Sequence, residues 1–125
     1  MNPRTMPMAF LPKVRSATLI EATHSMNCEL RIASFLGRPC RGDVMAVHLD
    51  FTTGKGMGTK VTDLAVVAGC DACHRLLDWR DKAGAEVLRE KYPAALMEQV
   101  LRALVVTQAR LVGLGIITVE NQSVI

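Results

Sequence analysis

Aromatic residues are scarce in this sequence. It contains one tryptophan, one tyrosine and three phenylalanines among 125 residues, whereas hydrophobic residues make up 50% of the chain. Aliphatic side chains must therefore fill the core, and no series of aromatic residues alternates with basic ones to stack single-stranded bases. The charged fraction of 22%, taken with the hydrophobic fraction, predicts one folded domain rather than a disordered chain.

Long apolar runs are also lacking. No stretch reaches the roughly 18 residues that a membrane-spanning helix needs, so no membrane partner is expected. The N-terminal segment MNPRTMPMAFLPKVRS contains prolines, and its apolar patch is too short for a secretory signal. We expect residues 1–23 to form a flexible arm and residues 24–125 to form the domain. Without a signal peptide, the expected compartment is the reducing cytoplasm.

The four cysteines are Cys28, Cys40, Cys70 and Cys73. Disulfides are disfavoured in a reducing compartment, and a Cys-x-x-Cys turn with a distant second pair is typical of a structural zinc site. Four buried free thiols are the alternative, which fits the wider pair better than the pair flanking Asp71. A redox dithiol would need a flanking βαβ pattern, and haem attachment at Cys-x-x-Cys-His would need export.

The pattern along the chain predicts an α+β fold. Residues 43–50 and 61–68 are apolar and rich in β-branched side chains, so we expect two strands joined by the glycine-rich loop FTTGKGMGTK. A short helix over 74–82 follows the Cys-x-x-Cys turn, then helices over 83–91 and from Pro93 to Gly113. The buried face predicted for the last helix consists of Met97, Val100, Leu101, Leu104, Val105, Leu111 and Val112. The predicted fold is therefore a small ββα unit held together by zinc and followed by two helices.

The order of strand histidine, glycine-rich loop, second strand and Cys-x-x-Cys-His resembles the HNH (ββα-metal) endonuclease motif. More narrowly, residues 24–118 resemble the YbcO-like nuclease family of lambdoid prophages. The residues that carry this resemblance are Cys28, Arg31-Ile32, Cys40, His48, Gly56-x-Gly58-x-Lys60-x-x-Asp63, Cys70-x-x-Cys73-His74, Asp78 and Thr107-Gln108. Nuclease activity in that family is largely inferred from its fold, so the resemblance leaves the function open.

The resemblance implies a phage- or prophage-encoded, metal-dependent DNA endonuclease acting in the cytoplasm of a bacterial host. His48 would be the general base and Asp63 would orient it. His74 and Asp78, one helical turn apart, would bind a catalytic cation such as Mg²⁺ or Mn²⁺, beside the structural Zn²⁺.

Two departures from the HNH pattern leave other roles open. Val47 stands where a metal-binding Asp or His often precedes the base, and a carboxylate, Asp63, replaces the usual amide. Asp63 or Asp50 could therefore bind the metal instead. Alternatively, His48 is a core histidine with one satisfied nitrogen, His74 is a fifth zinc-ligand candidate, and Asp78 and Arg80 form a solvated helix face. His24 receives no role.

The net charge of +3 and pI of about 8.8 are compatible with a polyanionic partner without requiring one. The candidates for binding DNA phosphates are Lys55, Lys60, Arg75 and Arg80. A hairpin loop with solvated lysines explains the first two equally well, and GKGMGTK lacks the ending of a Walker loop. A non-catalytic zinc-containing nucleic-acid-binding module in phage recombination or replication is the alternative function. An assembly factor that zinc merely stabilises is a third. No oligomeric state is indicated.

Overall fold

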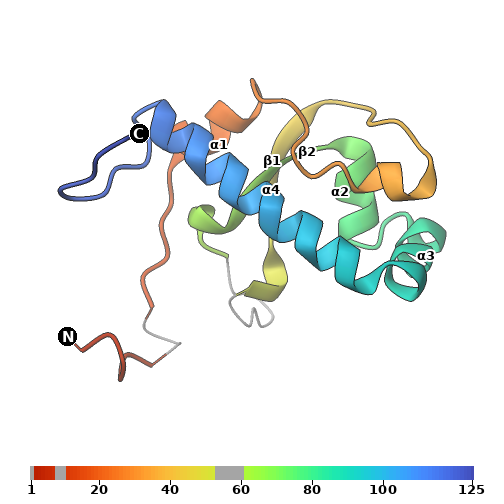
Figure 1. Cartoon of the computed structure of the whole chain (residues 1–125), viewed down its shortest axis with the longest axis horizontal. Helices are drawn as coiled ribbons and strands as arrows, with labels where there is room; N and C mark the ends of the chain where they lie inside the picture. The colour runs from red at the N-terminus through yellow and green to blue at the C-terminus, as the bar shows by residue number, and fades with distance from the viewer. Residues whose placement is uncertain (1, 8–10, 53–60) are drawn as a thin grey trace.

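The computed structural model describes residues 2–7, 11–52 and 61–125 (Figure 1). The helices are α1 Ala17–Thr23, α2 Asp71–Leu77, α3 Lys82–Lys91 and α4 Pro93–Gly113; the strands are β1 Val44–His48 and β2 Val66–Cys70; and short 3-10 helices lie at η2 Ile32–Leu36, η3 Asp50–Thr52 and η4 Asp63–Ala65. The predicted α+β class is confirmed. The second strand begins later than predicted because η4 occupies the start of that segment.

The two strands form an antiparallel sheet, in which Val44 is opposite Cys70 and His48 is opposite Val66. The helix α2 begins directly after β2 and packs back against both strands. Because the chain reverses direction between β2 and α2, the start of α2 lies beside Cys70 at the end of β2, and the rest of α2 runs alongside the sheet. One short helix can therefore contribute side chains to two separate sites.

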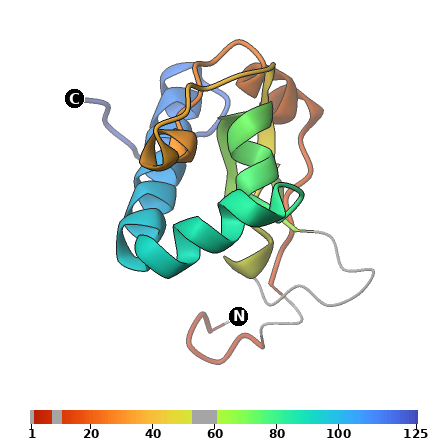
Figure 2. The same ribbon diagram turned by 90° about the vertical axis from the view of Figure 1, so that its right-hand side faces the viewer.

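Burial on both sides of the sheet stabilises this arrangement. Every residue of β2 is buried. Val47 and Val67 belong to a main cluster with residues of η2 and of α2, α3 and α4, while Val66 packs with Leu19 and Leu111 in a second cluster. Figures 1 and 2 show α4 running along the domain beside the sheet, with α3 connecting α2 to the N-terminal end of α4.

The buried face of α4 differs from the predicted one. Its buried residues are Leu96, Val100, Ala103, Thr107 and Leu111. Met97, Leu101 and Val105, predicted to be buried, are 45%, 61% and 58% exposed. The buried face of α4 is rotated relative to the predicted one because small and polar residues make the close contact with β2. The Thr107 hydroxyl accepts a hydrogen bond from the Ala68 N–H (3.2 Å) and donates one to the Ala103 carbonyl (2.7 Å).

The segment before residue 24 contains a helix where a flexible arm was expected. Ser16 caps α1 by accepting a hydrogen bond from the Leu19 N–H, and Leu19 and Thr23 are buried. Ahead of α1, the chain pairs with residues 61–63: the Asp63 N–H donates to the Val14 carbonyl (2.8 Å). The folded domain therefore includes residues that the sequence pattern placed in the arm.

Candidate metal centre and histidine cleft

The four cysteines come together from four segments of the chain. Cys28 follows α1, Cys40 lies between η2 and β1, Cys70 ends β2, and Cys73 lies in the first turn of α2. All four are free thiols, and their sulfur atoms lie within 4.8 Å of one another. The sulfurs of Cys40 and Cys73 are 4.0 Å apart. Four sulfurs around a zinc ion at about 2.3 Å would be about 3.8 Å apart, so this cluster could hold a metal ion with little movement.

Backbone N–H groups point at the sulfurs. The Cys28 sulfur accepts hydrogen bonds from the N–H groups of Arg31 (3.4 Å) and Cys70 (3.3 Å), and the Cys73 sulfur accepts one from Ala33 (3.4 Å). Such donors stabilise thiolates, which are the metal-binding form of cysteine. This donor set therefore fits a thiolate cluster better than it fits four inert thiols.

The thiols influence one another strongly. A hydrogen bond from the Cys73 thiol, helped by the backbone donors, lowers the pKa of Cys28 to about 4 in spite of burial. The same hydrogen bond to Cys28, together with burial, raises the pKa of Cys73. Desolvation and the neighbouring Cys28 raise the pKa of Cys40 to about 11. One thiolate thus forms readily, and a bound cation would be needed to draw the remaining protons off the cluster.

His48 and Asp63 form the second feature of the site. His48 ends β1, Asp63 begins η4, and the His48 Nε2 lies 2.9 Å from the Asp63 Oδ1. The Asp63 side chain is only 7% exposed. An ionised carboxylate can only accept hydrogen bonds, so the Nε2 of His48 must carry the hydrogen. This leaves Nδ1 as the basic nitrogen of a neutral His48.

The N-terminal segment holds Asp63 in place. The Ser16 N–H donates to the Asp63 Oδ2 (2.7 Å), and the Arg15 guanidinium lies 3.4 Å from Oδ1 while also donating to the Val61 carbonyl. Burial by itself would raise the pKa of Asp63. The hydrogen bonds from His48 and Ser16 and the charge of Arg15 outweigh it and hold that pKa below its usual range. Asp63 is therefore the charged partner of His48.

His74 and Asp78 face the same cavity as His48. This cavity, which we call the histidine cleft, has a volume of about 200 Å³, and its polar lining residues are His48, Asp50, His74 and Asp78. The His74 Nε2 is 3.5 Å from the Asp78 Oδ2, a distance too long for a strong hydrogen bond. The His74 Nδ1 is buried and has no hydrogen-bond partner in the described part of the chain. Burial also lowers the pKa of His74, which favours the neutral imidazole that binds metal ions.

The predicted phosphate contacts fall into three groups. Lys55 and Lys60 lie outside the described residues. Arg80 is engaged by Asp78, because its Nε lies 2.7 Å from the Asp78 Oδ2 and its backbone N–H donates to Oδ1. Arg75 is exposed on α2 next to His74. Of the described candidates, Arg75 is therefore the better placed to meet a phosphate, while Arg80 positions Asp78.

Sequence reasoning missed the residues that support the histidine pair. Nothing in the pattern around Arg15 and Ser16 indicated that they contact the segment at Asp63, since the contacts join segments nearly fifty residues apart and three of them involve backbone atoms. Asp50, considered from the sequence only as an alternative metal ligand, lines the cavity with the two histidines. His24 remains outside the site, where its Nδ1 lies 3.6 Å from the Glu21 carboxylate on α1.

Comparisons with known proteins add no relative. No protein-family model matches the sequence, and searches of curated proteins and of solved structures return no match. The HNH-like and YbcO-like resemblance is therefore carried by the sequence motifs alone. No helix in residues 2–7, 11–52 and 61–125 is long and apolar enough to cross a bilayer.

Proposed function

We propose that this chain is a phage- or prophage-type endonuclease of the HNH class, which hydrolyses phosphodiester bonds in DNA with the help of a divalent cation. One observation carries the proposal: His48, His74 and Asp78 line a single cavity, and His48 is hydrogen-bonded to a buried carboxylate. Hydrolysis of a phosphodiester requires a base for the attacking water and a positive charge near the phosphate. The cavity offers residues suited to both tasks.

His48 supplies the base. Its hydrogen bond to Asp63 fixes the ring orientation and the tautomer, so that Nδ1 can accept a proton from water. The negative charge of Asp63 then stabilises the imidazolium formed when the water is deprotonated. Because the pKa of Asp63 is low, the carboxylate stays ionised throughout this transfer.

His74 and Asp78 are the residues that would hold the catalytic cation. The His74 imidazole, whose Nε2 lies 3.5 Å from the Asp78 Oδ2, and the nearby Asp50 give the cavity a nitrogen and carboxylate donor set. Mg²⁺ or Mn²⁺ bound there would neutralise charge on the phosphate and stabilise the leaving oxygen. Arg80 holds Asp78 in place, because its Nε lies 2.7 Å from the same Oδ2 and its backbone N–H donates to Oδ1.

The cysteine cluster has a structural role in this proposal. Four thiolates leave no open ligand position on zinc, which distinguishes a structural site from a catalytic one. Zn²⁺ held by Cys28, Cys40, Cys70 and Cys73 would connect the segment after α1, the segment before β1, the end of β2 and the start of α2. These are the segments that set the position of α2, and therefore of His74.

Cleavage assays on matched histidine variants test the proposal. Full-length protein is incubated with Mg²⁺ or Mn²⁺ and with duplex, branched or single-stranded DNA. We expect His48→Ala to lower the cleavage rate by about 10²- to 10⁴-fold, the usual contribution of a general base. His24→Ala is the control, because His24 is a histidine outside the cavity. Its cleavage rate should equal that of the wild type.

Cation dependence separates the two histidines in the cavity. Excess cation should partly restore cleavage by His74→Ala, which has lost a ligand, and should not restore cleavage by His48→Ala, which has lost the base. Zinc content should be the same in all three variants. Cleavage by His48→Ala at the rate of His24→Ala would overturn the assignment of the base. A wild type that binds DNA but cuts none of the three substrates would favour the non-catalytic binding module instead.

A further inference from the structure

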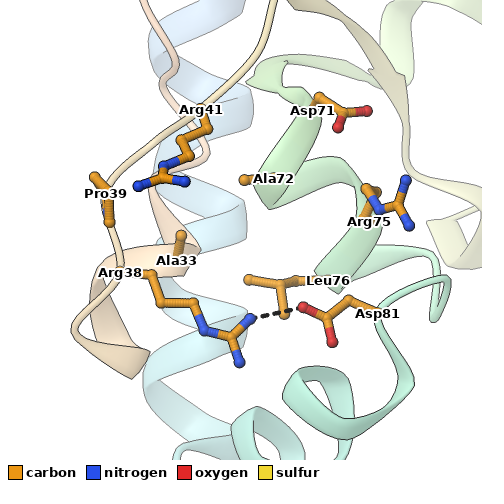
Figure 3. Close-up of a pocket in the computed structure, with 9 residues that line it drawn as sticks. All are labelled: Ala33, Arg38, Pro39, Arg41, Asp71, Ala72, Arg75, Leu76 and Asp81. Atoms are coloured by element: carbon orange, nitrogen blue, oxygen red, sulfur yellow. Dashed lines mark hydrogen bonds and ion pairs between the residues drawn. The ribbon is translucent and has the colours of Figure 1, made fainter.

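A second and larger cavity lies between η2 and α2. Its volume is about 480 Å³, and Ala33, Pro39, Ala72 and Leu76 form its apolar lining. The polar residues around it are Arg38, Arg41, Arg75, Asp71 and Asp81 (Figure 3). Three arginines against two aspartates leave an excess of positive charge. The proposed hydrolysis uses none of the residues that line this cavity.

The Arg38 side chain and the Arg41 backbone are held in place on the cavity wall. Arg38 forms an ion pair with Asp81 (2.7 Å), and Asp81 in turn caps α3 by accepting the Gly84 N–H. The backbone of Arg41 is fixed because its carbonyl accepts the Ala72 N–H (3.1 Å). The next residue must be glycine: Gly42 has a φ of +83°, and a Cβ there would lie 2.6 Å from the Asp71 Cβ.

Arg41 and Arg75 have no hydrogen bond or ion pair from their guanidinium groups to any described residue. Figure 3 shows the Arg41 side chain on the same side of α2 as Arg38, with the Arg75 guanidinium turned to the other side of the helix. Arg75 directly follows His74, which lines the histidine cleft. The Arg41 and Arg75 guanidinium groups thus lie on opposite sides of α2.

We propose that this second cavity binds a backbone phosphate of the DNA strand whose neighbouring phosphodiester enters the histidine cleft. Arg41, with Arg38 beside it, contacts that phosphate, and Arg75 contacts the strand where it crosses α2. Guanidinium groups are suited to this because they bind phosphate oxygens in a bidentate manner and keep their charge at any physiological pH. The inference rests on the proposed nuclease function, since the cleft defines where the strand must pass.

Binding measurements on an uncleaved complex test this inference. Full-length, zinc-loaded protein carrying His48→Ala is titrated into a short labelled duplex over a range of salt concentrations. In this background Arg41→Gln and Arg75→Gln should each weaken binding and reduce the slope of log K against log salt by about 0.9, the value for one lost phosphate contact. Arg102→Gln is the matched control, because Arg102 is exposed on α4 and does not line the cavity. It should leave the slope unchanged.

Zinc content and the binding of inorganic phosphate are measured on the same variants. Cys40 lies between Arg38 and Arg41, so loss of zinc from Arg41→Gln would mean that this arginine balances the thiolate charge, and would overturn the proposal. Inorganic phosphate is titrated by calorimetry as a second probe. Saturable phosphate binding that requires Arg41, with DNA affinity unaffected by Arg41→Gln, would overturn the proposal in favour of a small-anion site.

Cleavage by the protein with His48 intact is measured in parallel. If that protein cuts DNA, and Arg41→Gln and Arg75→Gln bind as Arg102→Gln does, the phosphate site is overturned while the nuclease function stands. If it cuts nothing, but Arg41→Gln and Arg75→Gln weaken binding as expected, the phosphate site is supported and the nuclease function falls.

Discussion

Asp63, the hydrogen-bond partner of His48, also receives contacts from the segment before α1. Its two oxygens lie within 3.4 Å of donors from His48, Ser16 and Arg15, while its backbone N–H bonds to Val14. These donors favour the charged form of the buried carboxylate and hold its pKa below the usual range. The HNH pattern usually has an amide in this place, and an amide would orient His48 without stabilising the positive charge that the histidine acquires.

We therefore expect Asp63→Asn to lower cleavage by about 10- to 100-fold, the range typical of residues that orient a catalytic group. The amide oxygen can still accept the hydrogen bond from His48, whereas the amide NH₂ replaces the Oδ2 that accepts from the Ser16 N–H, so that hydrogen bond is lost while zinc content should not change. A steady-state comparison with wild type and His48→Ala measures the effect. Cleavage by Asp63→Asn equal to that of the wild type would show that the charge of Asp63 contributes nothing to the reaction.

The lowered pKa of Asp63 also predicts how stability depends on pH. The folded state favours the ionised carboxylate, so Asp63 contributes stability above its unfolded pKa of about 3.9, and that stability is lost as pH falls through the lower folded value. The free energy of unfolding of the wild type should exceed that of Asp63→Asn at neutral pH. Denaturant titrations should show this difference shrinking below about pH 4. A difference that is constant down to the lowest pH would contradict the assignment.

At the scale of elements, α4 offers a direct test of the packing. Leu96 is 1% exposed, whereas Leu101, which the sequence pattern placed on the buried face, is 61% exposed. Leu96→Ala should cost about 2–5 kcal/mol of unfolding free energy, because it leaves a cavity in the main cluster. Leu101→Ala should change stability by no more than about 0.5 kcal/mol. Equal losses in the two variants would mean that the face of α4 is assigned incorrectly.

The elements whose pattern is local were predicted well from the sequence. The β-branched residues of β1 and Pro93 at the start of α4 each indicate their structure within a few neighbouring residues. The helix predicted over 74–82 instead spans Asp71–Leu77, because the Cys-x-x-Cys segment itself forms its first turn. The buried face of α4 was not predictable in this way, because Thr107 is buried through its hydrogen bond with Ala68 on β2 rather than through hydrophobicity.

The sequence predicted that the four cysteines cluster, whereas the residues that support the histidine pair could not be predicted. The four cysteines and His48, Asp63, His74 and Asp78 are of residue types that have few roles in such a motif, so their spacing was informative. From the sequence alone, Arg15 and Arg41 look like ordinary surface arginines. Only the tertiary contacts show that Arg15 holds Asp63 and that Arg41 lies on a cavity wall.

At the scale of the whole molecule, the N-terminal segment and the loop before β2 act as one unit. Arg15 joins the Val61 carbonyl to the Asp63 carboxylate, and this is a link between distant parts of the chain. Arg15→Gln should lower cleavage by up to about 10-fold, at the weak end of the range for orienting residues. Arg4→Gln is the matched control, since Arg4 is exposed and makes its hydrogen bond through the backbone N–H. Equal rates for both variants would contradict the role of this link.

The cysteine cluster should determine whether the domain is folded at all. A structural zinc site contributes roughly 10–16 kcal/mol, which is as large as the roughly 5–15 kcal/mol stability of a typical domain. Cys70→Ser is therefore expected to lose zinc and to unfold, as judged by metal analysis and circular dichroism. A zinc-free Cys70→Ser that keeps the wild-type melting temperature would refute the structural role of the metal.

Cys73 and His74 are neighbours on α2, yet one belongs to the sulfur cluster and the other lines the cleft. A chelator would therefore inactivate the protein with two time constants. Loss of a cation from His74 and Asp78 should be fast and reversed by adding Mg²⁺ or Mn²⁺. Loss of the zinc ion should be slow, since it requires the buried Cys70 and Cys73 to open, and Mg²⁺ should not reverse it. The time that the protein has spent with the chelator, rather than the concentration of Mg²⁺ or Mn²⁺ added afterwards, would then decide whether its activity returns.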